Sequence, residues 1–328
     1  MVTGDSEGLK VRAALLRGRS LLSFGQFGAV WIAVVALFLV SGLISPAMLQ
    51  LGQVLNILQV AAFLGVLATG QTIAVLVGGI DLSQAGMVTL VNILSTTIML
   101  GSDANTASAV LLCLVAAAAV GLLNGAIVTL LNITPLIATL AMNSILFGAA
   151  LVFTGGAPHG DASAGFQWIG AGSVSGVPVS TIFWLAIALA VAWVMGKTVY
   201  GRWLYAAGAN PTAARLMGVP VIPVIVSAYV MSALLAAIGG LLLTAYIGAP
   251  SLGIGNQFLL TSVAAVVVGG TVLTGGVGSI LATIGGTIFI TELNSFTNVI
   301  RITTGTQMVL QGTIIALSVL IYRAIARS

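Results

Sequence analysis

Ionisable side chains are scarce in this sequence, and the few that interrupt apolar stretches are the first candidates for chemistry. The 328 residues include six acidic residues, ten basic residues, one histidine and one cysteine. Asp81 and Glu292 adjoin or lie within long apolar runs, where an ionisable residue is a functional candidate by default. His159 and Cys113 each stand alone, so no catalytic triad or metal site can be assembled. We expect no catalytic residues and no metal, and Cys113 reads as a small buried hydrophobe.

Each carboxylate leaves two interpretations open. Asp81 follows Gly78-Gly79 and precedes a new apolar run with Ser83 beside it. It therefore either caps a helix N-terminus or takes part in gating or in a solute path. Glu292 either is a satisfied interface residue or carries protons. Two isolated carboxylates without a basic partner are weak support for a proton-coupled transporter.

Uncharged polar side chains inside apolar runs suggest a path for a polar solute. Amides and hydroxyls can hydrogen-bond a sugar without trapping it. Besides Asp81, the candidates for such a translocation path are Asn56, Gln59, Asn92, Asn143 and Ser144. The alternative for each is a hydrogen bond between helices, which contributes about 0.6 to 2 kcal/mol.

The composition requires lipid as the solvent. Hydrophobic residues make up 59% of the chain and charged residues only 5%, and the mean hydropathy is +1.21. A soluble protein carries roughly a quarter charged residues. The basic isoelectric point of about 9.6 does not indicate nucleic acid, because the basic residues lie at the edges of apolar runs, where orientation signals belong. We expect an all-α, polytopic membrane protein.

Apolar runs near the required length of about 20 residues predict about ten transmembrane helices. They cover residues 27–45, 51–79, 82–100, 108–131, 133–153, 181–196, 221–247, 257–273, 277–295 and 306–323. The second run is long enough to tilt or break, and Thr69, Gly70 and Gln71 fall where a break would lie. The whole chain, 1–328, reads as one transmembrane domain.

The basic residues orient these spans with both termini in the cytoplasm. Four lie in the N-terminal segment 1–26, three in the connection 197–220 and two at the C-terminus, so nine of the ten fall on one side and only Arg301 on the other. This distribution fits the rule that cytoplasmic segments carry the basic residues. Residues 154–180, rich in Gly, Ser and Pro, then form an outer loop.

The inner segment 197–220 carries signals for short helices. Asn210 followed by Pro211 is a typical helix start, and Gly218 supplies a left-handed end for a helix over residues 212–217. Residues 200–207 predict another short helix. Helices this short must dock on something, either on their own bundle or on a cytoplasmic partner.

Two further patterns are weak. Gly196-Lys197-Thr198 is similar to the end of a phosphate-binding loop, but Val191 stands where that motif needs a glycine. We therefore expect no nucleotide or other cofactor on this chain. AVLVGGIDLS at 74–83 and AVVVGGTVLT at 265–274 echo each other, either as a decayed repeat or through convergent turn chemistry.

Several segments, in order, resemble the permease subunits of bacterial ribose-type carbohydrate importers driven by ATP. They are GGIDLS at 78–83, NG at 124–125, ITPLIATLAMNSI at 133–145, TGGAP at 154–158, GRWLYAAGANPTAARLMGVPV at 201–221 and AAVVVGGTVLTGGVGS at 264–279. The likeness covers most of the chain from about residue 51. Gln84-Ala85-Gly86 departs from the family's more usual Val-Gly.

The resemblance implies a multi-subunit importer of a monosaccharide or a similar small polar solute, located in a bacterial inner (plasma) membrane. It implies a second permease subunit, two ATPase subunits or one double ATPase that bind ATP and Mg²⁺, and a solute-binding protein outside. The coupling loop 197–220 would contact the ATPases through Arg202, Gly208, Asn210, Pro211, Ala213, Ala214, Arg215 and Gly218. The alternative is an ATP-independent channel or secondary carrier, which would leave the capped inner loop unexplained.

Overall fold

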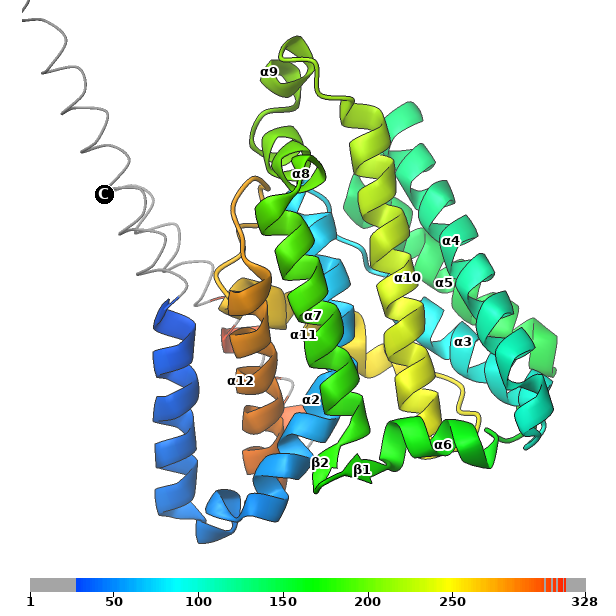
Figure 1. The fold of residues 1–328 in the computed structure, drawn as a ribbon, viewed down its shortest axis with the longest axis vertical. Helices are drawn as coiled ribbons and strands as arrows, with labels where there is room; N and C mark the ends of the chain where they lie inside the picture. Colours follow the sequence, from blue (N-terminus) through cyan, green and yellow to red (C-terminus); the bar gives the residue numbers. More distant parts are fainter. Residues whose placement is uncertain (1–27, 304, 308, 311, 315, 317–328) are drawn as a thin grey trace, which may run out of the picture.

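The computed structural model describes residues 28–303, 305–307, 309–310, 312–314 and 316. These residues are mostly helical, as predicted (Figure 1). After an N-terminal helix, Gly28–Ile44, the elements are η1 Pro46–Leu49, α2 Leu51–Leu76, α3 Ser83–Met99, η2 Asp103–Asn105, α4 Thr106–Leu130, α5 Pro135–Thr154, α6 Ala164–Ala171, β1 Ser173–Val174, β2 Val177–Pro178, α7 Val179–Lys197, α8 Val199–Ala209, α9 Pro211–Leu216, α10 Val221–Ile247, η3 Ile254–Gln257, α11 Phe258–Val268 and α12 Ile280–Val299. The two short strands pair antiparallel.

Six helices of the described part are long and apolar enough to cross a membrane. They are α2, α4 with η2, α5, α7, α10 and α12. The N-terminal helix and the η3–α11 helix are apolar but shorter, and α3 has 17 residues. The basic clusters at 1–26 and at the C-terminus, and most of the predicted span 306–323, lie outside the described residues.

The structure excludes a break in the second predicted span and shortens the eighth. The helix α2 runs unbroken through Thr69, Gly70 and Gln71. Its polar side chains need no break there, because the Thr69 hydroxyl donates to a carbonyl of its own helix and Gln71 reaches another segment. The run 257–273 is helical only to Val268, because two glycines follow and the chain continues without helix to Ser279.

Glycines allow the helices to approach closely. The longest helix, α10, packs on α4, and Gly121 and Gly125 of α4 face it. A Cβ added at Gly125 would lie 2.7 Å from the Val226 Cα atom. This spacing of two small residues, four apart, is a common contact between membrane helices, where close packing replaces the hydrophobic drive. Gly65 of α2 similarly makes room for the fully buried Trp184 of α7.

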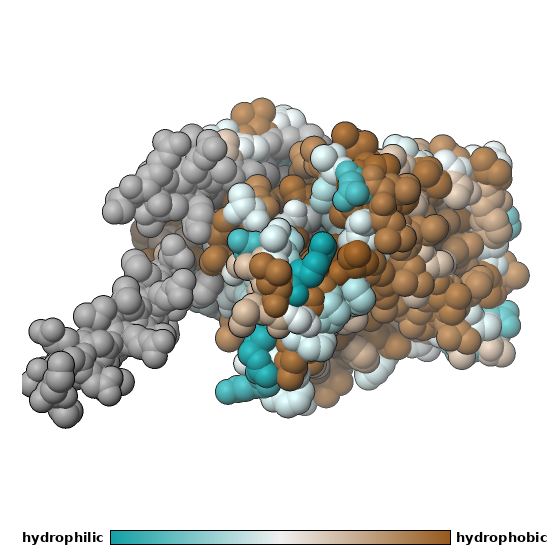
Figure 2. Space-filling view, turned by 90° about the horizontal axis from the view of Figure 1, so that it is seen from above, coloured by the Kyte–Doolittle hydropathy of each residue, from teal (hydrophilic) through white to brown (hydrophobic). Residues whose placement is uncertain are grey.

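The molecule has two distinct ends. At one end, called the α8 end, lie α8 and α9; at the other, called the α6 end, lie α6 and the β-hairpin (Figure 1). Figure 2 is a view onto the α8 end, where hydrophilic side chains mix with apolar ones. The flank that carries α4 and α5 is strongly apolar. An apolar flank beside a more polar end is the expected surface of a bundle solvated by lipid.

Two stretches at the α8 ends of helices leave the helical form: turn 77–82 after α2, and loop 269–279 after α11. They contain the two echo sequences. The positive φ falls on the first glycine of one pair, Gly78, and on the second of the other, Gly270. Correspondingly, Gly79 N donates to the Ala74 carbonyl but Thr271 N donates to the Val266 carbonyl. When the two echo sequences are aligned, the equivalent backbone conformation therefore occurs one residue later in the second echo than in the first.

Side chains satisfy the backbone of turn 77–82. The Gln71 amide, oriented to pair both groups, donates to the Asp81 carbonyl (3.0 Å) and accepts from the Asp81 N–H (3.2 Å). The Thr139 hydroxyl of α5 accepts from the Leu82 N–H (3.0 Å) and contacts the Ile80 carbonyl (2.9 Å). Unpaired backbone groups away from water are costly, so these two side chains make the turn tolerable inside the bundle.

The first prediction concerns Thr139. Replacing Thr139 by Val keeps the shape but leaves the Leu82 N–H without an acceptor, which costs about 1–3 kcal/mol. We expect the unfolding temperature in detergent to fall by a few degrees. Cys113, the only cysteine, is fully buried, so a thiol-reactive dye reports unfolding directly.

The matched control is Thr129→Val. The Thr129 hydroxyl donates only to the carbonyl of Gly125 in its own helix, so its loss leaves no backbone donor unpaired. Equal unfolding temperatures for the two variants would contradict the role given to Thr139.

Candidate functional site

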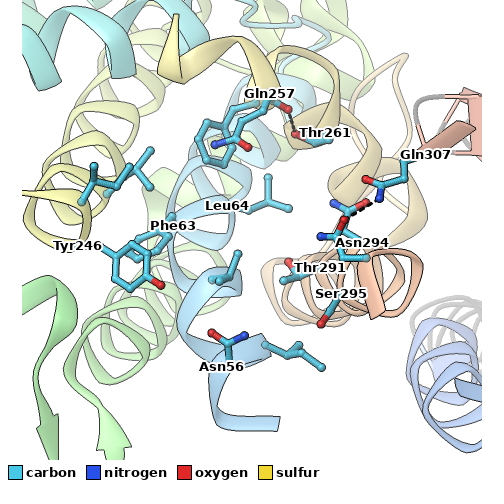
Figure 3. A pocket seen from close by; sticks show the side chains of 16 residues that line it. Asn56, Phe63, Leu64, Tyr246, Gln257, Thr261, Thr291, Asn294, Ser295 and Gln307 are labelled. Carbon is cyan, nitrogen blue, oxygen red and sulfur yellow. Dashed lines mark hydrogen bonds between the residues drawn. The ribbon is translucent and has the colours of Figure 1, made fainter. Parts of the chain in front are cut away.

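A pocket of about 460 Å³ lies between α2, α10, the η3–α11 helix and α12 (Figure 3). Its lining residues are Asn56, Ile57, Val60, Phe63, Leu64, Leu243, Tyr246, Ile247, Gln257, Phe258, Thr261, Thr291, Asn294, Ser295, Asn298 and Gln307. The volume falls within the usual range for small-molecule sites, about 300–1,000 Å³. None of these residues carries a charge.

The lining combines hydrogen-bonding side chains with an aromatic pair. The rings of Phe63 and Tyr246 have centroids 5.2 Å apart, while amides and hydroxyls from α2, α11 and α12 lie across from them (Figure 3). Amides offer both donors and acceptors, and hydroxyls offer either. Such a lining suits an uncharged solute with several hydroxyl groups.

The polar residues of α12 recur at helical spacing. Thr291, Asn294, Ser295 and Asn298 stand three and four residues apart and all line the pocket. Positions with this spacing share one face of a helix. None of them is among the residues predicted from the sequence, although a polar stripe on an apolar helix is a signal that could have found them.

Among the residues predicted for the path, only Asn56 lines the pocket. Gln59, one turn farther along α2, donates instead to the Gly170 carbonyl of α6 (3.2 Å). Asn92 ties α3 to the stretch after α10, because its amide accepts from Ser251 N (2.7 Å) and donates to the Ala249 carbonyl (3.2 Å). The contacts of these two amides are structural ones.

The last two amide and hydroxyl candidates lie on α5, away from the pocket. Asn143 is half-buried against α3, where Gly86 makes room for it. Ser144 is exposed, and its hydroxyl donates to the Leu140 carbonyl of its own helix (3.3 Å). The structure therefore does not bring the predicted path residues together.

Asp81 lies at the centre of a buried polar cluster rather than in the pocket. One carboxylate oxygen accepts from the Ser83 N–H (3.1 Å) and hydroxyl, and the other accepts from the Ser232 hydroxyl of α10 (2.6 Å). The amides of Asn124 and Gln84 donate to those two serines. Asp81 thus accepts a hydrogen bond from a backbone N–H at the start of α3, as a helix cap would, and also links α3 to α10.

Glu292 is buried between α12 and the N-terminal helix. Its carboxylate accepts from the Ser41 hydroxyl at 3.5 Å, and its side chain is 2% exposed. It points away from the pocket-lining stripe of α12, since it is absent from the lining. Cys113 is buried, as predicted, and the described residues contain no group of three potential metal ligands.

The inner segment has the predicted local form. Thr198, which ended the phosphate-loop-like sequence, caps α8 by accepting from Gly201 N (3.2 Å). Asn210 caps α9 by accepting from Ala213 N (2.9 Å), and Pro211 is the first residue of the helix. Gly218 follows with φ +82°.

Most, but not all, of the residues predicted to contact ATPases are exposed. Arg202, Asn210, Pro211, Ala213, Arg215 and Gly218 are exposed, whereas Ala214 is buried and Gly208 half-buried. Leu216 and Met217, which the sequence analysis did not select, are 85% and 84% exposed at the tip of the molecule. These two side chains form an apolar pair at the end of the capped helix α9.

The outer segment is held against the bundle by its own short helix. Ser163 caps α6 at Phe166 N, and the Asp103 carboxylate accepts from Gly165 N (3.0 Å). Phe166 is buried and Trp168 is exposed. His159 lies on the surface, where its carbonyl accepts from the Thr97 hydroxyl.

Comparison with known proteins identifies the family. The model of the family described as "Branched-chain amino acid transport system / permease component" matches residues 53–319. The chain belongs to this family. It is a permease and a multi-pass protein of the bacterial inner membrane.

Curated relatives of the permease cover nearly its whole length. The ribose import permease protein RbsC of Escherichia coli K12 is 32% identical over 295 residues, 88% of this chain and 91% of the relative. RbsC of Bacillus subtilis 168 is 34% identical over 302 residues, 91% and 92%. The galactose/methyl galactoside import permease protein MglC of E. coli K12 is 30% identical over 322 residues, 93% and 96%. No solved structure matches the chain significantly.

Proposed function

We propose that this permease is the membrane-spanning subunit of an ATP-driven, binding-protein-dependent importer of a monosaccharide or a similarly small polar solute. The observation that carries the proposal is the uncharged, hydrogen-bonding pocket at one end of a bundle whose other end presents a capped, exposed helix. The names of the relatives, ribose and galactose import permeases, support the same solute class.

The pocket favours a sugar over the amino acids in the family's description. An amino acid carries an ammonium and a carboxylate, and a charge taken out of water requires a charged or strongly hydrogen-bonding partner. The pocket offers neutral amides, hydroxyls and an aromatic pair, and no Asp, Glu, Lys or Arg. The hydroxyl groups of a neutral polyol can form hydrogen bonds with these side chains, and no charge is left unpaired.

We assign the α8 end to the cytoplasm. Lys197, Arg202 and Arg215 all belong to the connection at this end, while Asp103 and Asp161 belong to segments at the α6 end. Basic residues mark the cytoplasmic side. Together with the terminal basic clusters of the sequence, this orientation supports about ten spans with both termini inside.

In this orientation the exposed tip of α9 faces the ATPases. Leu216 and Met217 supply apolar anchors and Arg215 supplies a charge beside them. Two permease subunits, identical or related, enclose the path, with the pocket of each turned toward it. The solute-binding protein docks outside, against residues 154–180 and the stretch 248–256. ATP and Mg²⁺ bind the ATPases.

The division of labour follows from energetics. Shifting a two-state population from 1:99 to 99:1 takes about 5.5 kcal/mol of differential binding. A permease that binds neither ATP nor a charged solute has no such source of its own. The partners supply the bias, and the permease is the element that has two states.

The test of ATP dependence is reconstitution. The permease is placed in liposomes with its ATPase and binding protein, and uptake of labelled ribose and galactose is measured with and without ATP. We expect uptake only with all components and ATP. Full uptake by the permease alone would establish the channel or carrier alternative instead.

A second prediction concerns the docking tip. Leu216→Asp and Arg215→Glu should each abolish co-purification of the ATPase, because one removes an apolar anchor and the other reverses a charge. The control, Val174→Asp, alters an exposed apolar residue at the α6 end and should retain the ATPase. Retention by all three variants would refute the docking role of α9, while Cys113 labelling verifies that each is folded.

A third prediction concerns the pocket. Asn56→Leu and Thr261→Val each remove one hydrogen-bonding group from the lining, a loss of about 1 kcal/mol and so roughly fivefold in solute interaction. We expect uptake at saturating binding protein to fall several-fold in each. Thr129→Val is the control for Thr261→Val, since both hydroxyls donate to a carbonyl four residues earlier but Thr129 lies outside the pocket. Equal uptake by all three variants would exclude the pocket from the path.

A further inference from the structure

The end of α8 touches two segments that are about 200 residues apart in the sequence. The Gly276 N–H of loop 269–279 donates to the Leu76 carbonyl at the end of α2 (2.9 Å). The Tyr205 hydroxyl of α8 donates to the Gly278 carbonyl of the same loop (2.9 Å). Burial raises the pKa of Tyr205 above its ordinary value. Figure 1 shows α8 next to the end of α2 and the loop that precedes α12.

Glycines bring the three backbones into direct contact. A Cβ added at Gly208 of α8 would overlap the Leu76 carbonyl oxygen and lie 2.8 Å from Gly276 N. One added at Gly275 would lie 2.8 Å from Gly78 N and 3.0 Å from the Gly208 carbonyl oxygen. Gly275 also has φ +89°, which other residues rarely adopt. We call Gly208, Gly275, Gly276 and Leu76 the glycine joint.

Backbone contacts of this kind transmit displacement better than contacts between flexible side chains. No side chain stands between the segments to change rotamer and absorb a shift, and close-packed contacts rearrange between discrete states rather than deforming smoothly. A movement of α8 therefore moves the end of α2 and the loop before α12 together.

The helices α2 and α12, whose ends meet at the joint, also line part of the pocket. The Thr72 and Thr283 hydroxyls lie 2.8 Å apart and link α2 to α12 near the joint. Farther along, α2 contributes Asn56 and Phe63 to the lining, and α12 contributes its polar stripe. The chain of contact from α9 to the pocket thus runs through α8, the joint and these two helices.

We propose that the glycine joint is the point where α8 passes the movement of the docked ATPases to α2 and α12, and so opens and closes the pocket. The proposal rests on the proposed function, because it takes α9 as the docking element. It assigns to Gly208 and Tyr205 a positioning role distinct from contact with the ATPase.

The test compares three variants in the complete transporter, in liposomes with ATPase and binding protein. Gly208→Ala inserts a methyl group into the joint, Tyr205→Phe removes one hydrogen bond without adding bulk, and Gly196→Ala adds a methyl group in open space at the end of α7. We expect the ATPase to co-purify with all three. Uptake should fall at least tenfold for Gly208→Ala and several-fold for Tyr205→Phe, and should be unchanged for Gly196→Ala.

A labelling experiment separates transmission from general damage. Val60, a pocket residue 41% exposed, is replaced by Cys in each background, and its alkylation rate is measured with and without ATP and vanadate. The proposal requires an ATP-dependent change in the Gly196→Ala background that is lost in Gly208→Ala and reduced in Tyr205→Phe. A change of full size in all three would overturn it.

The outcomes distinguish the joint from the function it serves. If the unaltered permease fails to retain the ATPase, the proposed function itself is wrong. If the ATPase is retained and Tyr205→Phe matches Gly196→Ala in both uptake and labelling, the joint is not the point of transmission. Should Gly208→Ala fail to fold, as dye labelling of Cys113 would reveal, Tyr205→Phe alone decides.

Discussion

The constraint on which the structure depends is that every backbone amide inside the bundle needs a partner where the chain is not helical. Lipid offers none, so irregular backbone exists only where protein side chains or another backbone segment supply the hydrogen bonds. Turn 77–82 meets this requirement through Gln71 and Thr139. Loop 269–279 meets part of it through the Leu76 carbonyl. Each irregular segment is thereby attached to a neighbour, and separating the two would leave backbone groups unpaired away from water.

This attachment differs from the way in which the long helices are held together. The long helices α4 and α10 lie against each other through small residues and have little reason to separate. The irregular segments are joined instead through a few directional hydrogen bonds at the α8 end, close to α8 itself. A rearrangement there disturbs few contacts, whereas one through the middle of α10 would disturb many.

The sequence predicted much of the local structure because local structure follows from local signals. The run 221–247 is the helix α10 at the same bounds, and Asn210-Pro211 caps α9 as expected. The path residues were harder to predict, because an amide in an apolar helix has no preferred partner until the fold is known. Asn92 bonds a loop more than 150 residues away. The stripe from Thr291 to Asn298 has a helical spacing that is visible in the sequence alone.

The absence of charge from the pocket has an electrical consequence. Moving one elementary charge across a membrane gains or loses about 2.3 kcal/mol per 100 mV. The lining from α2, α10, α11 and α12 contains no ionisable group of the Asp, Glu, Lys, Arg or His type. A neutral solute passing such a lining carries no current and shifts no fixed charge within it. Accumulation of the solute would then be set by the ATPases alone, at the same level in energised and in depolarised cells.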